Sequence, residues 1–505
     1  MMKKDKLSIL VAASEAAPLA QAGGLGDVAG SLPLVFRDLG HRVAVVLPAY
    51  RHMLEKNPPF ELAAKGLPIR LGRLNLTADI LAGELGPGVP AYLVRRDEFF
   101  DRTELYGSSQ GEYIDNWERY IFFSRSIPAL CEAIGFIPDV ILANDWQTGL
   151  VMALLEQGVL PQTAGVFAIH NLGYLGLVPP ERMESIGLPD TYYTMEGLEY
   201  FGQMSLLKAG IVYAQEVVTV SPTYAKEIQT PEYGLGMAGL MYSVRDRLHG
   251  ILNGVDYKIW NPATDQNIAA NYSPRDFVGK SRCKQELLKE MGLPNDLSER
   301  PLVGMVTRLF DQKGCRLVAE AAEELFALDL GLVLLAAGEV RYQQLFTEIQ
   351  AQHPSRFGLR LGFDPVLSHK IFAGCDMFLM PSLYEPCGLT QMYSLRYGTI
   401  PIVRATGGLQ DTVIDPNEAN SPGTGFKFYR FHKDELIAAI RRAIEAFRNR
   451  KIWQAMMRKA MAQDFSWERS AKEYIAVFEQ AVASKLGRKK ADKLLYRGSD
   501  RTGFT

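Results

Sequence analysis

Short apolar runs alternate with longer amphipathic stretches along the chain, and this alternation predicts strands separated by helices. In the first half the runs are rich in valine and isoleucine, as is typical of parallel strands that are covered on both faces. The predicted strands of this half cover residues 7–13, 42–47, 91–94, 140–142, 166–169 and 217–220. Helical patterns separate them, for example over residues 28–39 and 148–156.

A second series of strand and helix patterns follows a region rich in turn signals. That region, residues 253–280, contains Asn-Gly, Asn-Pro and Ser-Pro pairs and is predicted to be a linker. The predicted strands of the second series cover residues 302–306, 332–336, 377–380 and 401–403. Two such series predict an α/β fold with two doubly wound, Rossmann-like domains.

The predicted domain boundaries follow from this division. The N-terminal domain covers residues 1–255 and the C-terminal domain covers residues 256–465. Ser466 is a candidate N-cap, so we expect a final helix over residues 466–487. The basic residues beyond it predict a polar tail over residues 488–505.

The composition, 47% hydrophobic and 22% charged, excludes a disordered or fibrous chain. The formal net charge of -2 provides no basic field for nucleic acid or an anionic membrane. Five widely spaced cysteines without a Cys-x-x-Cys pair favour neither a disulfide framework nor a zinc site, and they fit a reducing cytoplasm. The apolar run after the charged start is short, which predicts a buried strand rather than a signal peptide.

The first predicted strand leads through a glycine-rich loop into a helix, an arrangement that binds phosphate groups in many α/β proteins. The loop covers residues 14–27 and contains Gly-Gly-Leu-Gly at residues 23–26. Glycine lets the backbone approach an anion closely. The spacing matches neither the dinucleotide fingerprint nor a P-loop, so a purely structural turn stays open as the alternative.

Polar residues also follow two later strands of the first series. Asp145 and Trp146 could bind a sugar hydroxyl and stack on a sugar ring, although Asp145 could instead be only the N-cap of the next helix. His170 ends the following strand and is either part of the site or an ordinary structural histidine. Ligands bind at the carboxyl ends of strands in doubly wound sheets, which makes these residues candidates.

In the second series, Arg308 and Lys313 follow the first strand and together suit a diphosphate, because Arg offers a planar fork and Lys a mobile charge. Glu385 follows the strand over 377–380 and can accept hydrogen bonds from sugar hydroxyls. The N–H groups of residues 387–389 can donate to the same hydroxyls. Cys387 has no neighbouring base that would form a thiolate, so we expect a backbone donor there.

A second glycine pair, at residues 406–409, follows the strand over 401–403 and could hold another anion. In their order and spacing, these motifs closely resemble one family, the bacterial glycogen synthases and plant starch synthases. The likeness runs from about residue 7 to residue 474. Its landmarks stand at residues 23–28, 144–146, 170–172, 208–210, 221–224, 252–256, 308, 312–314, 385–391, 396–399 and 406–409.

The resemblance implies the GT-B fold, in which two Rossmann-like domains face each other across a cleft and the final helix returns to the first domain. It implies a retaining glycosyltransferase that moves glucose from ADP-glucose to the nonreducing end of an α-1,4-glucan such as glycogen. No metal, other cofactor, nucleic acid or membrane is implied. We therefore expect a cytoplasmic enzyme.

The resemblance also implies roles for individual side chains. The expected catalytic residues are Arg308, Lys313, Glu385, His170 and Asp145. The expected substrate-binding residues are Gln21, Gly23, Gly24, Glu15, Asp27, Tyr106, Asn253, Phe363, Cys387, Gly388, Leu389, Thr406, Gly407 and Gly408. By this analogy Arg308 and Lys313 neutralise the leaving diphosphate, and Phe363 stacks on the base.

One position departs from the pattern of the family. The first glycine motif usually reads Lys-x-Gly-Gly-Leu, whereas this chain has Gln21 in place of the lysine. The lysine is associated with the phosphates of the donor, so its loss could weaken donor binding by roughly 1.5–3 kcal/mol. A UDP-sugar-dependent GT-B glycosyltransferase and a glucan-binding paralogue weakened by Gln21 therefore stay open as alternatives.

Overall fold

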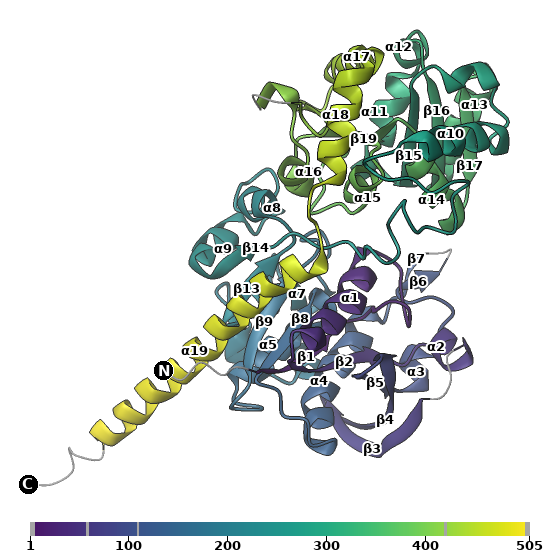
Figure 1. Ribbon diagram of the computed structural model, residues 1–505. Helices are drawn as coiled ribbons and strands as arrows, with labels where there is room; N and C mark the ends of the chain where they lie inside the picture. The colour runs from purple at the N-terminus through teal and green to yellow at the C-terminus, as the bar shows by residue number, and fades with distance from the viewer. Residues whose placement is uncertain (1–5, 57–59, 109–110, 419–421, 500–505) are drawn as a thin grey trace, which may run out of the picture. The chain divides into compact units, whose positions relative to one another are not determined.

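The computed structural model describes residues 6–56, 60–108, 111–418 and 422–499, and the chain forms two compact units (Figure 1). Unit 1 consists of Met1–Val220, Ala225–Ile251 and Trp467–Thr505. Unit 2 consists of Ser221–Tyr224 and Leu252–Ser466. Each unit is built around one large sheet, as the two series of apolar runs predict.

Unit 1 contains a nine-stranded sheet in the order β14-β13-β9-β8-β1-β2-β5-β4-β3. The strands from β14 to β5 are parallel, and β4 and β3 extend one edge in antiparallel pairing. Their bounds are β1 (Ser8–Ala12), β2 (Arg42–Pro48), β3 (Glu61–Leu71), β4 (Leu74–Gly86), β5 (Val89–Arg95), β8 (Val140–Asn144), β9 (Ala164–Ile169), β13 (Glu216–Thr219) and β14 (Leu248–Gly250). Two small sheets join β6 (Gly107–Ser108) to β7 (Gly111–Glu112), and β10 (Leu177–Val178) to β12 (Gln203–Ser205) and β11 (Glu199–Tyr200).

Two groups of helices pack on this sheet. In the first group α4 packs against α5, and α5 packs against α7. In the second group α1 packs against α19. The bounds of the helices are α1 (Gly24–Asp38), α2 (Arg51–Lys56), α3 (Asp97–Phe100), α4 (Asn116–Ala133), α5 (Trp146–Glu156), α6 (Met183–Ile186), α7 (Leu206–Tyr213), α8 (Pro222–Glu227), α9 (Ala238–Ser243) and α19 (Trp467–Ser499). Every residue of β8 and β9 is buried, which is why these strands read as continuous apolar runs.

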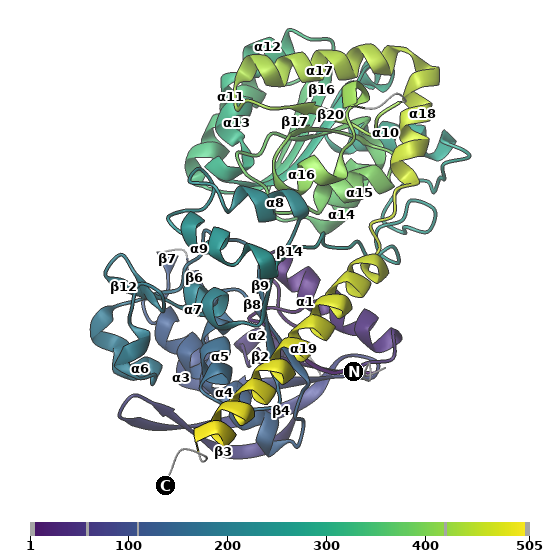
Figure 2. The ribbon, with the colours of Figure 1, turned by 90° about the vertical axis from the view of Figure 1, so that its left-hand side faces the viewer.

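Unit 2 contains a six-stranded parallel sheet in the order β17-β16-β15-β18-β19-β20. Its strands are β15 (Leu302–Leu309), β16 (Gly331–Gly338), β17 (Phe357–Leu361), β18 (Met377–Met380), β19 (Ile400–Arg404) and β20 (Phe426–Phe428). Its helices are α10 (Val278–Glu290), α11 (Cys315–Glu320), α12 (Ala322–Phe326), α13 (Val340–Gln352), α14 (Pro365–Gly374), α15 (Thr390–Arg396), α16 (Gly407–Thr412), α17 (Lys433–Arg448) and α18 (Arg450–Met461). In Figure 2, β16, β17 and β20 run between α17 on one side and α14 and α15 on the other.

The order of the strands places a topological switch point in each sheet. In unit 1 the chain adds β2 and β5 on one side of β1 and then returns to add β8, β9 and β13 on the other. In unit 2 it adds β16 and β17 on one side of β15 and then β18, β19 and β20 on the other. Ligands of such sheets bind at the carboxyl ends of the strands that flank the switch. The loops after β1 and β8, and after β15 and β18, are therefore the places to look for a site.

Two sequence predictions are corrected by the structure. The final helix, predicted over residues 466–487, continues as α19 to Ser499. Residues 488–499, predicted to be a tail beyond that helix, are therefore helical. Lysine, arginine, alanine and leucine all favour a helix, which explains the extension. The stretch predicted as a linker, residues 253–280, packs into unit 2. Its Asp265 is buried and accepts hydrogen bonds from His369 and Tyr397, which the turn signals of the segment did not indicate.

Within the ranges that the structure describes, no helix is long and apolar enough to cross a membrane.

Candidate functional site

The loop after β1 is organised around the buried carboxylate of Glu15. The backbone N–H groups of Ala22 and Gly23 donate to Glu15 Oε2 at 2.6 and 2.8 Å. The carboxylate therefore occupies the position that an external anion would take at these two donors. The glycine loop is not an empty phosphate cradle at residues 22 and 23, since its own Glu15 holds it in shape.

Tyr106 reaches the same carboxylate from the segment that precedes β6. Its hydroxyl donates to Glu15 Oε1 at 2.6 Å, and Ser14 Oγ lies 2.7 Å from the same hydroxyl. Burial, followed by the charge of Glu15, raises the pKa of Tyr106 well above its ordinary value. The phenol therefore stays protonated at neutral pH and serves as a hydrogen-bond donor. The structure thus joins Glu15 and Tyr106, which sequence analysis proposed separately.

Gln21 and Asp27 form a second contact within the loop. Burial raises the pKa of Asp27 to about 6; a hydrogen bond from Gln21 lowers it, and the nearby charge of Glu15 raises it further. Gln21 also lies over Gly26, where a Cβ atom would come within 2.8 Å of Gln21 Cγ. Gln21, which departs from the family pattern, is therefore an exposed and uncharged side chain that hydrogen-bonds to Asp27.

Asp145 and His170 lie at the ends of neighbouring strands, β8 and β9. The backbone N–H of His170 donates to Asp145 Oδ1 at 2.7 Å, and His170 Nε2 lies 2.9 Å from Asn144 Oδ1. The side chain of Asp145 makes no capping bond to α5, so the alternative that it is only an N-cap is set aside. Asp145 also has φ 55° and ψ -176°. Non-glycine residues rarely adopt this strained conformation, and such strain is concentrated at functional sites.

The protonation states of these two side chains are both shifted towards neutrality. Burial raises the pKa of Asp145 to about 7, although N–H donors from His170 and Asn171 oppose the shift, and Glu15 adds a small upward contribution. Burial lowers the pKa of His170 to about 4. The imidazole is therefore neutral at pH 7 and can exchange hydrogen bonds with an uncharged sugar without adding a positive charge.

In unit 2, the switch point brings Lys313 and Glu385 together. Lys313 Nζ donates to Glu385 Oε1 and Oε2 at 2.8 and 2.7 Å, and Ser382 Oγ donates to Oε2 at 2.9 Å. Glu385 is buried, so the cation and the hydroxyl compensate the cost of removing its charge from water. Arg308, the other predicted cation, is exposed within β15, and its guanidinium lies 5.6 Å from the ring centroid of Phe310.

The chain that follows Glu385 presents backbone donors. Among the described residues, the N–H groups of Cys387, Gly388 and Leu389 have no protein acceptor. Burial raises the pKa of the Cys387 thiol to about 12, so the residue is no thiolate nucleophile, as the sequence indicates. Asn253 packs here through its backbone N–H, which bonds to the Cys387 sulfur, while Asn253 Oδ1 is buried without a partner in the described ranges.

The glycine pair after β19, Gly407 and Gly408, packs against the backbone of the loop that contains Glu385. The N–H of Gly408 donates to the carbonyl oxygens of Glu385 and Pro386 at 3.1 and 3.2 Å. Gly407 has φ 45°, and a Cβ atom on it would lie 2.0 Å from the Glu385 carbonyl oxygen. Thr406 and both glycines are buried. This packing gives the pair a structural role in holding the Glu385 loop, which differs from the anion cradle expected from the sequence.

Phe363 lies just beyond the carboxyl end of β17, and 90% of its surface is exposed. β17 is parallel to β15 and lies two strands from it in the sheet. Phe363 and the loop that contains Lys313 therefore both follow the carboxyl ends of strands on the same side of the sheet. An exposed aromatic ring there is available to stack on a planar ligand.

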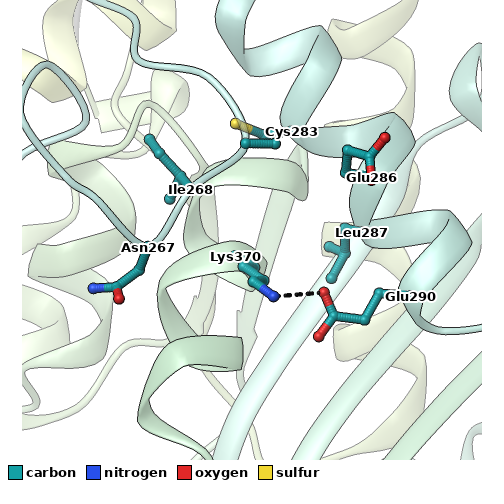
Figure 3. A pocket seen from close by; sticks show the side chains of 8 residues that line it. Asn267, Ile268, Cys283, Glu286, Leu287, Glu290 and Lys370 are labelled. Carbon is teal, nitrogen blue, oxygen red and sulfur yellow. Dashed lines mark hydrogen bonds and ion pairs between the residues drawn. The ribbon is translucent and has the colours of Figure 1, made fainter.

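A separate pocket of about 220 Å³ lies elsewhere in unit 2 (Figure 3). Lys370 Nζ donates to Glu290 Oε2 at 2.8 Å across one side of it. The lining residues are Asn267, Ile268, Ala269, Cys283, Glu286, Leu287, Glu290 and Lys370. None of these is a predicted site residue, so the pocket is distinct from the candidate site.

Several residues that support the predicted site residues were not assigned a role from the sequence. They are Ser14, Asn116, Arg119, Asn144 and Ser382, of which Ser14 and Asn144 lie within motifs that the sequence does indicate. Asn144 directly precedes Asp145 at the end of a strand, and this position is a usable signal. The sequence carries no signal for the contacts of the others, because their partners are set by the fold.

Two family models match long stretches of this chain. Residues 8–243 match the family model of the starch synthase catalytic domain, and residues 294–460 match that of the glycosyl transferases group 1. A glycogen synthase of Desulfatibacillum aliphaticivorans is 50% identical, over 95% of this chain and 100% of its own length. A glycogen synthase of Syntrophotalea carbinolica is 45% identical, over 94% of this chain and 99% of its own length.

The same relationship holds for solved structures. The catalytic domain of starch synthase IV from Arabidopsis thaliana, bound to ADP and acarbose, matches with a TM-score of 0.87 and 33% identity, over 95% of this chain and all of that one. The two units, one with a mixed and one with a parallel sheet, thus form a GT-B fold. The chain therefore belongs to the glycogen and starch synthase family of glycosyltransferases, and it is a glucosyltransferase of the glycogen synthase type.

Proposed function

We propose that this enzyme transfers glucose from ADP-glucose to the nonreducing 4-hydroxyl of an α-1,4-glucan and retains the anomeric configuration. The observation that supports this most directly is the Lys313–Glu385 pair at the switch point of unit 2, next to the open N–H groups of residues 387–389. An ammonium group suits a diphosphate, and a carboxylate beside N–H donors suits sugar hydroxyls. The ADP and acarbose in the related starch synthase IV support the same classes of donor and acceptor.

Unit 2 supplies the groups that we assign to the donor. Lys313 and Arg308 neutralise the negative charge that develops on the diphosphate as the glycosidic bond breaks. Glu385 and the N–H groups after it bind the hydroxyls of the glucose, and Phe363 stacks on the base. Lys313 and Glu385 compensate each other's charge before the substrate enters, so Arg308 gives this set of groups one net positive charge.

Unit 1 supplies the groups that we assign to the glucose, to the acceptor and, through the glycine loop at residues 21–24, to the phosphates of the donor. His170, neutral at pH 7, exchanges hydrogen bonds with a hydroxyl, and Asp145 accepts from one. Glu15 and Tyr106 hold the glycine loop in its shape, and Gln21 and Asp27 line that loop.

The proposed reaction follows from the state of the carboxylates. Glu385 is engaged by Lys313 and Ser382, and Asp145 has a pKa of about 7, so neither is an unencumbered nucleophile. The bond between the glucose C1 and the diphosphate oxygen breaks, and the acceptor 4-oxygen bonds to C1 on the same face. The proton of that hydroxyl passes to an oxygen of the leaving phosphate. The products are ADP and a glucan longer by one glucose.

We place the reaction in the cytoplasm, a setting with which the buried, unpaired thiols are compatible. The roles assigned above use side chains and backbone groups alone, with no metal, nucleic acid or membrane.

The test is incorporation of labelled glucose into glycogen, with ADP-glucose and UDP-glucose supplied in parallel at equal concentration. The expected result is incorporation from ADP-glucose, release of the label by an enzyme specific for α-1,4 links, and loss of activity in Lys313→Ala. Incorporation from UDP-glucose alone would assign a different donor. Binding of glycogen without transfer from either donor would overturn the proposal in favour of a glucan-binding protein.

A further inference from the structure

Arg119, in the first turn of α4, is completely buried, although its guanidinium carries a full positive charge. It donates to the carbonyl oxygens of Phe99 and Leu105 at 2.6 and 3.1 Å and to Asn116 Oδ1 at 2.6 Å. Among the described residues, no carboxylate pairs with it, and its Nη2 has no partner. Three aromatic rings surround the guanidinium at 5.1–5.6 Å from their centroids, namely Phe100, Tyr113 and Tyr120.

A buried charge of this kind is not explained by stability alone, because well-packed apolar side chains of similar size often give the folded protein equal or greater stability. What the guanidinium provides is a rigid fork of donors with fixed directions. It donates to Phe99 in α3 and to Leu105 in the chain between α3 and α4, and that chain carries Tyr106. The arrangement therefore indicates that Arg119 fixes the backbone position of that segment.

Asn116 extends the contact to Tyr106 itself. Its Oδ1 accepts from Arg119, and its Nδ2 donates to the Tyr106 carbonyl oxygen at 2.8 Å. The N–H of Tyr113 donates to the same carbonyl at 3.0 Å. The two consecutive carbonyls of Leu105 and Tyr106 are thus held from α4, one directly by Arg119 and one through Asn116.

From Tyr106 the chain of hydrogen bonds continues to the glycine loop. The Tyr106 hydroxyl donates to one oxygen of Glu15, and the other oxygen accepts from Ala22 and Gly23. Each of these bonds lies within unit 1 and joins segments that are distant in the sequence. A shift of the Tyr106 backbone therefore moves or releases Glu15, and with it the loop at residues 21–24.

We propose that Arg119 is a positioning residue for the transfer reaction. It holds the backbone at Leu105 directly and at Tyr106 through Asn116, so that Tyr106 fixes Glu15 and Glu15 fixes the glycine loop at residues 21–24. This inference rests on the proposed function, which assigns the loop at residues 21–24 to the substrate. A role in the stability of α4 alone would place no demand on the glycine loop.

The test uses the donor KM, because this constant does not depend on how much of the sample is folded. Arg119→Lys keeps the charge but loses the fork, and Asn116→Ala removes the donor to Tyr106 while the cation stays. Each should raise the KM for ADP-glucose at least about fivefold and leave the KM for glycogen within about twofold. Arg356→Lys is the matched control, since Arg356 donates to the carbonyl oxygens of Phe326, Leu328 and Leu330, all within unit 2.

A double-mutant cycle tests the route through the phenol. Tyr106→Phe removes the bond to Glu15, so adding Arg119→Lys should lower kcat/KM for the donor by no more than about twofold further. Multiplicative losses in the double variant would overturn the route. A parent-like donor KM in both Arg119→Lys and Asn116→Ala would overturn the positioning role. An inactive parent enzyme would instead refute the proposed function, which keeps the two failures distinct.

Discussion

The two shifted side chains at the ends of β8 and β9 should oppose each other in the pH dependence of stability. In the folded state the pKa of Asp145 is raised to about 7 and that of His170 is lowered to about 4, from ordinary values of 3.8 and 6.5. Between pH 4 and 7 the folded protein keeps a proton on Asp145 that the unfolded chain releases, so this group makes stability fall as pH rises. Between pH 4 and 6.5 the unfolded chain holds a proton on His170 that the folded protein lacks, so this group makes stability rise.

The two effects are similar in size. One pKa unit corresponds to about 1.4 kcal/mol, so full titration of Asp145 costs roughly 4 kcal/mol and that of His170 changes stability by roughly 3 kcal/mol. In the parent enzyme they largely cancel between pH 4 and 6.5. Replacing either side chain with a neutral isostere should uncover the other.

The variants are chosen to keep the hydrogen bonds. Asp145→Asn retains an oxygen that accepts from the N–H of His170, and His170→Gln retains a donor for Asn144 Oδ1. Relative to the parent, Asp145→Asn should gain roughly 4 kcal/mol of unfolding free energy between pH 4 and 7. His170→Gln should lose roughly 3 kcal/mol between pH 4 and 6.5, again relative to the parent.

The assay is urea unfolding at several pH values, followed by tryptophan fluorescence. The chain has five tryptophans, and one of them, Trp146, is buried beside Asp145 with its ring edge-to-face with Tyr120 at 5.0 Å. Only differences between variant and parent are compared, which removes the titration of all other groups. Both variants should keep the same dependence on urea concentration. A difference between Asp145→Asn and the parent that stays flat within about 1 kcal/mol from pH 4 to 7 would refute the reasoning.

Three further predictions concern the site. Lys313→Ala should lower kcat by about 100-fold or more in the glucose incorporation assay, because it leaves a buried carboxylate unpaired and removes a charge from the leaving group; a rate within twofold of the parent would contradict the assignment. Gln21→Lys should lower the donor KM and steepen its salt dependence in steady-state kinetics, even though part of the new charge will pair with Asp27; a flat or worse KM at low salt would show that the neutral side chain is an adaptation. Gly408→Ala should lower the melting temperature and the activity, because its Cβ would lie 2.1 Å from a carbonyl oxygen, whereas Gly239→Ala, with nothing within 4 Å, should do neither.

The parallel cores were predictable because burial on both faces produces continuous apolar runs. β8 and β9 are buried at every residue, and β18 is found at the predicted residues, Met377–Met380. β3 and β4 were not predicted, because most of β3 is exposed and its few buried positions leave no clear period. The extended edge of the first sheet therefore had no signal in the apolar pattern.

For the candidate site, the rule that ligands bind at strand ends selected the loops from the sequence but did not indicate which side chains pair within them. Glu15 and Tyr106 are 91 residues apart in the sequence, and Lys313 and Glu385 are 72 apart. Their pairing depends on the order of strands in each sheet, which a single sequence does not reveal. The packing role of Gly407 and Gly408 was also hidden, because it depends on a close approach to the Glu385 loop.

The return of the last helix to unit 1 has a consequence for biosynthesis. Phe36 in α1 packs against Tyr474 and Phe478 of α19, with ring centroids 6.2 and 5.4 Å apart, so the first unit to be translated is finished by residues translated after the whole of unit 2. Until α19 leaves the ribosome, the nascent unit 1 displays an uncovered apolar stripe along α1, which is the kind of surface that chaperones bind and that drives aggregation. Unit 2, whose long segment is continuous, has all of that segment available before then. Synthesis of unit 1 therefore begins before that of unit 2, but the last segment of unit 1 is synthesised after the last segment of unit 2.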